Sequence, residues 1–144
     1  MADSPEPIAP RPVPPIFVVT GGYGAVGDQL CRNVLAQYPG ADVPVVIVSQ
    51  VHQREQIEQV ISQAETSGGV ILHTMVQPEL RRLLETDAAE RGIRTIDVIG
   101  PIQDHVAGIL GREPLGRPGL YRQLHENYFK RIEGLEFTMA HDDG

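Results

Sequence analysis

The sequence has little cysteine, no long apolar run and no export signal, and each absence excludes a class of protein. Its one cysteine, Cys31, cannot form an internal disulfide, and neither it nor the five histidines have the spacing of zinc ligands, so we predict no metal site. No apolar run reaches the roughly 18 to 20 residues that cross a bilayer. The acidic, proline-containing N-terminus is unlike a secretory signal. We expect a cytoplasmic protein without membrane contact.

Lysine is almost absent, because Lys130 is the only one in 144 residues. A P-loop needs a lysine directly after its last glycine, to reach the terminal phosphates of a nucleotide. Lys130 instead lies between Phe129 and Arg131, with no glycine-rich loop before it. None of the serines lies in a G-x-S-x-G turn, which argues against a serine hydrolase. We therefore predict no catalytic residue in these 144 residues.

The net charge argues against a nucleic-acid partner, and the proline content marks a tail at the N-terminus. The formal net charge is −7 and the basic residues are scattered, so nucleic acid is not an expected partner. Residues 2–15 hold six of the twelve prolines, and we expect residues 1–15 to form a disordered tail. The segment Pro12 to Pro15 also matches a P-x-x-P ligand for an aromatic-lined groove.

From Ile16 onward, short β-branched runs alternate with amphipathic segments. The runs are nearly apolar throughout, which is typical of parallel strands covered on both faces. Such alternation predicts one α/β domain over 16–144, with a Rossmann-like, doubly wound, mostly parallel sheet of about four strands flanked by helices. The expected strands are 16–20, 44–49, 69–74 and 94–99.

Three apolar stripes of helical spacing predict the crossover helices. They consist of Leu30, Val34, Leu35 and Tyr38, then Ile57, Val60, Ile61 and Ala64, then Leu80, Leu83, Leu84 and Ala88. Pro78 is suited to begin the third helix and Gly92 to end it. After Gly100 we expect a short helix to Leu110 and a Gly/Pro-rich loop over 111–119. A C-terminal helix should follow, with Leu124, Tyr128, Ile132 and Leu135 on one side.

The segment Gly22 to Gly27 matches G-x-G-x-x-G between the first strand and the first helix, where dinucleotide-binding folds place it. The acid that would hold the ribose is missing, because the second strand ends Val48-Ser49-Gln50. A dinucleotide site, an anion or phosphate site and a purely structural turn all remain open. Since ligands of open α/β sheets gather outside the carboxyl ends of strands, the candidate ligand-binding residues are Thr20, Gly22, Gly24, Gly27, Ser49 and His73.

Several segments together resemble one family, the regulatory proteins of pyruvate, phosphate dikinase and of phosphoenolpyruvate synthase. They are 17–28, 35–39, 78–81, 98–101, and especially 128–137 running into His141-Asp142-Asp143-Gly144. The resemblance implies a bifunctional enzyme that uses ADP to phosphorylate a threonine of its target and phosphate to remove that group as pyrophosphate. It also implies ADP/ATP and phosphate as the family's ligands, the dikinase or the synthase as partner, and a homodimer.

The family's P-loop lies just beyond the Asp-Asp-Gly with which this sequence ends. We therefore expect the chain to be an N-terminal domain that is not catalytic alone and holds no cofactor. At the first loop the family has serine-aspartate, a small residue and glycine, where this sequence has Thr20 to Gly24. One alternative is a stand-alone nucleotide- or phosphate-binding module, with Arg81, Arg82 and Arg94 as phosphate contacts. Another is an interaction domain that docks through the tail or the last helix.

Overall fold

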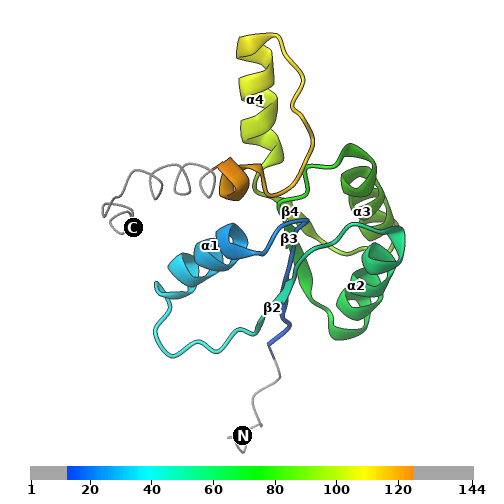
Figure 1. The fold of residues 1–144 in the computed structure, drawn as a ribbon. Coiled ribbons are helices and arrows are strands. Elements are labelled where there is room, and N and C mark those ends of the chain that lie inside the picture. Colours follow the sequence, from blue (N-terminus) through cyan, green and yellow to red (C-terminus); the bar gives the residue numbers. More distant parts are fainter. Residues whose placement is uncertain (1–12, 125–144) are drawn as a thin grey trace, which may run out of the picture.

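The structure, a computed structural model, describes residues 13–124, and four parallel strands alternate there with four helices (Figure 1). In chain order the elements are β1 Ile16–Val19, α1 Ala25–Leu35, β2 Val45–Val48, α2 Arg54–Ser67, β3 Val70–His73, α3 Pro78–Glu90, β4 Thr95–Asp97 and α4 Gly100–Leu110. A further helical stretch begins at residue 120 and is described as far as 124. Most of the expected tail and of the expected last helix lies outside the described residues.

The strands form one all-parallel sheet in the order β2-β1-β3-β4, which confirms the predicted α/β, Rossmann-like class. Val18 of β1 pairs with Ile47 of β2 on one side and with Leu72 of β3 on the other. The chain therefore adds β2 to one edge of β1 and β3 to the opposite edge. In open α/β sheets, the crevice outside the carboxyl ends of two such strands is the usual ligand site.

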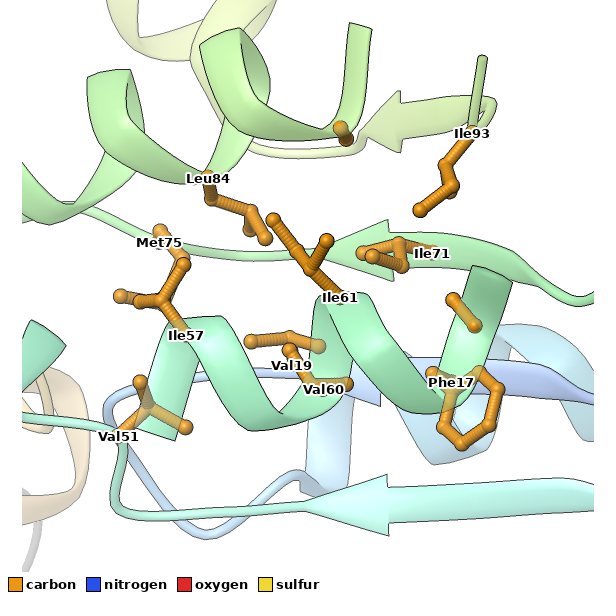
Figure 2. Close-up of a cluster of buried hydrophobic side chains, with 12 residues drawn as sticks. Phe17, Val19, Val51, Ile57, Val60, Ile61, Ile71, Met75, Leu84 and Ile93 are labelled. Atoms are coloured by element: carbon orange, nitrogen blue, oxygen red, sulfur yellow. The ribbon is translucent and has the colours of Figure 1, made fainter. Parts of the chain in front are cut away.

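The main core lies between the sheet and the helices α2 and α3 (Figure 2). The inward-facing residues of β1 and β3, such as Phe17, Val19 and Ile71, meet the predicted stripe of α2. All four members of that stripe are buried, and on α3 Leu84 and Ala88 are buried while Leu80 and Leu83 are partly buried. Burying a side chain such as Ile57 stabilises the fold by about 1.5 to 3 kcal/mol. The predictions for these two helices are confirmed.

The stripe predicted for α1 is wrong. Leu30, Val34 and Tyr38 are 39%, 57% and 60% exposed, and α1 instead packs on the sheet through Gly27 and Cys31. A Cβ on Gly27 would collide with a methyl group of Val18, so the absence of a side chain lets the helix backbone approach the strand. Figure 1 shows α1 on the face of the sheet opposite α2 and α3. Close approach of small residues, not apolar bulk, decided which face is buried.

The expectation that every strand is covered on both faces is also wrong. Val46 and Ile47 of β2 and Ile96 of β4 are each more than a third exposed. The helix predicted after Gly100 is confirmed as α4, which buries only that glycine and exposes most of its apolar side chains. Among the residues that the structure describes, no helix is both long and apolar enough to cross a membrane.

Candidate functional site

A cavity of about 370 Å³ lies at the carboxyl ends of β1 and β3. Its walls combine the first loop and first turn of α1 with residues 117–122, which include the end of the loop after α4 and the start of the next helical stretch. Thr20 follows β1 directly and Thr74 follows β3, and both line the cavity. The cavity thus occupies the position where this type of sheet places its ligands.

Two glycines give the first loop its shape. Gly24 precedes α1 with φ of +92° and ψ of 4°, a left-handed conformation that a residue with a side chain rarely adopts. A Cβ there would lie 2.5 Å from Ile47 Cγ2. The N–H of Gly22 donates a hydrogen bond to Thr20 Oγ1 over 3.1 Å. The loop is therefore a tight turn that places the N-terminus of α1 against the cavity.

Thr20 and Thr74 join the two central strands at the floor of the cavity. The hydroxyl of Thr74 donates to Thr20 Oγ1 over 2.8 Å, although the two residues are 54 positions apart in the chain. Thr20 is only 6% exposed, so its side chain is largely shielded from solvent. Alternation along the strands puts both residues on the α1 side of the sheet, opposite the main core.

Both charged side chains of the cavity are cationic. Among the described residues that line it, Arg117 and Arg122 carry charge and no aspartate or glutamate is present. The guanidinium carbon of Arg122 lies 4.5 Å from the centre of the Tyr23 ring, a cation–π arrangement. Although the net charge of the chain is −7, the charged side chains that line this cavity within residues 13–124 are both positive.

The structure brings three of the six candidate residues together. Thr20, Gly22 and Gly24 line the cavity. Gly27 does not, because it is buried against Val18, and Ser49 is half-buried outside the cavity at the end of β2. His73 is fully buried on the other face of the sheet, where its strand partner Val19 belongs to the main core.

Among the cavity residues that the sequence did not predict are Thr74, Arg117 and Arg122. Thr74 had a signal, because it directly follows β3 as Thr20 follows β1. Arg117 and Arg122 had none, since they come from an irregular loop and the stretch after it. The arginines proposed from the sequence as phosphate contacts, Arg81, Arg82 and Arg94, do not line the cavity.

A second polar cluster surrounds His73. Its Nε2 lies 3.0 Å from a carboxylate oxygen of Glu85 on α3, and its Nδ1 accepts a hydrogen bond from the N–H of Met75 over 3.2 Å. Because Nδ1 is an acceptor, we assign the ring proton to Nε2, which then donates to Glu85. Arg81 lies between the acids, 2.8 Å from Asp97 and 3.8 Å from Glu85.

The three side chains of His73, Glu85 and Asp97 are close enough to hold a metal ion, with ligand atoms within 4.8 Å of one another. Their hydrogen bonds argue for an ion-pair network instead. A cation would need the lone pair of His73 Nε2, yet moving the proton to Nδ1 would set it against the N–H of Met75. The guanidinium of Arg81 already balances the negative charge of Asp97. The cluster therefore links α3 to the ends of β3 and β4.

Asp97 also holds the start of α4. One carboxylate oxygen accepts the N–H groups of Ile99 and Gly100, over 3.0 and 2.6 Å. Burial by itself raises the pKa of the Asp97 carboxyl. The two backbone hydrogen bonds and the positive charge of Arg81 outweigh burial, so that the pKa lies below its ordinary value of 3.8. The ionised form of Asp97 is therefore the form that stabilises this corner.

Comparison with known proteins gives one family. The family model described as kinase/pyrophosphorylase matches residues 16–144. Proteins of two strains of Chloroflexus aurantiacus, each named as a pyruvate, phosphate dikinase regulatory protein, are 44% identical over 141 residues, which is 98% of this chain and 50% of theirs. A protein of the same name from Desulfotalea psychrophila is 35% identical over 129 residues, covering 90% of this chain and 46% of its own length. The chain thus spans about half the length of these relatives.

Proposed function

The chain belongs to the kinase/pyrophosphorylase family, and we propose that it is the N-terminal domain of a regulator of pyruvate, phosphate dikinase or phosphoenolpyruvate synthase. The observation that carries the proposal is the 44% identity to dikinase regulatory proteins across 98% of this chain. In this proposal the whole regulator transfers a phosphoryl group from ADP to a threonine of its target, and removes it with inorganic phosphate.

We place the phosphoryl transfer outside these 144 residues. Transfer from a nucleotide depends on a lysine and backbone N–H groups that hold the terminal phosphates. The one lysine, Lys130, has no glycine-rich loop before it. The cavity beside α1 offers arginines and hydroxyls but no carboxylate, among its described residues, that could accept the proton of a threonine. The domain should therefore recognise its target or complete a neighbouring site.

The experiment is a phosphotransfer assay with purified pyruvate, phosphate dikinase and ADP. The 144-residue chain is compared with the Chloroflexus aurantiacus relative, and phosphothreonine on the dikinase is measured by mass spectrometry. We expect phosphothreonine with the relative and none with the chain. Phosphothreonine formed by the chain alone would place the chemistry within these residues and contradict the assignment.

A second candidate is a module that binds a nucleotide or phosphate without catalysis. The observation that favours it is the cavity itself, because Thr20, Gly22 and Gly24 line it beside the N-terminus of a helix, where anions bind well. The two candidates are compatible, since a regulatory domain can also hold a ligand. They differ in what they require, because ligand binding by this cavity needs no dikinase.

A further inference from the structure

We propose that the cavity at the ends of β1 and β3 binds the phosphate group of a small phosphomonoester, with the organic part of the ligand against its apolar wall. The inference rests on the second candidate function and specifies its ligand and the groups that hold it. Neither the dikinase assignment nor the family of the chain is needed for it.

The charged side chains that line the cavity in the described residues are positive. Arg117 is exposed at the cavity and Arg122 lies over the ring of Tyr23. No carboxylate from the described part of the chain reaches the lining, and Asp28, in the first turn of α1, is paired with Arg32. A cavity whose described lining residues carry only positive charge attracts an anion, although the chain as a whole has a net charge of −7.

The hydroxyls of Thr20 and Thr74 have one hydrogen more than their described acceptors use. A threonine hydroxyl has one hydrogen and two acceptor lone pairs. Thr20 Oγ1 accepts the N–H of Gly22, and the bond between Thr20 and Thr74 uses one of their two hydroxyl hydrogens. Whichever way that bond runs, one hydrogen of the pair has no acceptor among the residues described. Thr20 is 94% buried, Thr74 is partly buried and both line the cavity, so the remaining hydrogen is available to an oxygen that enters the cavity.

The first turn of α1 provides backbone N–H donors at the cavity. The N–H groups of Gly24, Ala25 and Val26 donate to no acceptor within residues 13–124, and all three residues line the cavity. Together with the threonine pair and Arg117, they present donors from three separate segments of the chain. A phosphate has three terminal oxygens that accept from several directions, whereas a carboxylate has two in one plane.

Another part of the cavity wall is formed by apolar and aromatic residues. Val76, Ile99 and Leu120 line it, together with the aromatic rings of Tyr23 and Tyr121. A volume of about 370 Å³ is far larger than one phosphate group needs and is at the lower end of the range for small-ligand pockets. The ligand should therefore be an ester whose organic part is small and apolar or aromatic.

The test is isothermal titration of the full chain with phenyl phosphate, inorganic phosphate and phenol. We expect phenyl phosphate to bind more tightly than inorganic phosphate, and phenol to show no measurable binding. Equal affinities for the ester and for inorganic phosphate would overturn the assignment of an ester. If neither phosphate compound binds at millimolar concentration, the proposal is wrong, and the dikinase assay is unaffected by that result.

Substitutions of Thr20 and Thr74 test whether their hydroxyls donate hydrogen bonds to the phosphate. The double substitution Thr20→Val with Thr74→Val removes both hydroxyls at nearly constant volume and should weaken phenyl phosphate binding by roughly tenfold or more. The double substitution Thr20→Ser with Thr74→Ser keeps the hydroxyls and should stay within about threefold of the original affinity. Ser49→Ala, outside the cavity, is the matched control and should change nothing.

A variant at the rim keeps the proposal testable if the double valine variant fails to fold, as judged by circular dichroism. Arg117→Met removes the charge of an exposed side chain and should weaken binding by roughly threefold to tenfold. Unchanged affinity in Arg117→Met and in a folded double valine variant would overturn the assignment of the site to this cavity.

Discussion

The imidazole of His73 lies 3.0 Å from the carboxylate of Glu85, and this contact ties β3 to α3 at the carboxyl end of the sheet. His73 is fully buried, whereas the Glu85 side chain is 38% exposed. The two partners therefore differ in how much stability their removal costs. A buried ring leaves a cavity when it is truncated, but a half-exposed carboxylate can be rehydrated.

His73→Ala should lower the free energy of unfolding by about 2 to 4 kcal/mol, because it removes a packed ring and leaves the N–H of Met75 without its acceptor. Glu85→Gln is the matched change on the partner, since its amide oxygen can still accept from Nε2. It should cost about 1 kcal/mol or less. Urea unfolding followed by circular dichroism measures both. Equal losses for the two variants would contradict the assigned roles.

Asp97 should make the stability depend on acid. Because its folded pKa lies below the ordinary value of 3.8, its ionised form contributes stability that is present above that value and is lost as the pH falls through the lower folded value. Asp97→Asn should cost about 1.5 to 3 kcal/mol at neutral pH, through weaker bonds to Ile99, Gly100 and Arg81.

Urea unfolding curves measure the free energy of unfolding from neutral pH to below about pH 4, which is near the ordinary pKa of aspartate. The chain with Asp97 should lose stability more steeply in the acid range than Asp97→Asn does. Parallel curves for the two proteins would show that Asp97 is not a source of the acid dependence.

Gly27 should tolerate no side chain. A Cβ there would collide with Val18 and lie 3.3 Å from Leu72 Cδ2, so Gly27→Ala should push α1 away from the sheet and cost about 1 to 3 kcal/mol. Gly108, inside α4, is a matched control because a Cβ there meets nothing within 4 Å. Gly108→Ala should stabilise the chain by about 0.5 to 1 kcal/mol. Thermal unfolding of the two variants should shift in opposite directions, and a stabilised Gly27→Ala would refute the close packing of α1.

Cys31 should react slowly in the folded chain. Burial, and to a smaller extent the negative charge of Asp28, raise the pKa of its thiol above the usual value, and it is only 3% exposed. The thiolate is the reactive form, so labelling by a coloured disulfide reagent at neutral pH should be roughly a hundredfold slower than in denaturant. Fast native labelling would mean that α1 opens easily.

The order of strands and helices was predictable because short β-branched runs and apolar stripes with a period of 3.6 residues are local properties of the sequence. The buried face of α1 was not. Leu30, Val34 and Tyr38 have more apolar area than Gly27 and Cys31, and only the contact with Val18 reveals that a small residue is needed there. The strand ends were placed within two residues, since fraying and turns blur such boundaries.

The position of the cavity was predictable where it depended on the sheet. Thr20, Gly22 and Gly24 follow the first strand, and the carboxyl ends of strands are where ligands gather. His73 and Thr74 are adjacent in the chain, but alternation sends His73 into the core and Thr74 to the cavity. Arg117 reaches the cavity from an irregular loop, and no local pattern predicts how such a loop folds back.

The central claim is that these residues act as one domain of a dikinase regulator, and a chimera tests it most directly. The chain would replace the matching half of the Chloroflexus aurantiacus relative, to which it is 44% identical. The chimera would then be assayed for ADP-dependent formation of phosphothreonine on pyruvate, phosphate dikinase. We predict that it phosphorylates the dikinase, while the chain alone does not. A chimera that folds but forms no phosphothreonine would contradict the claim.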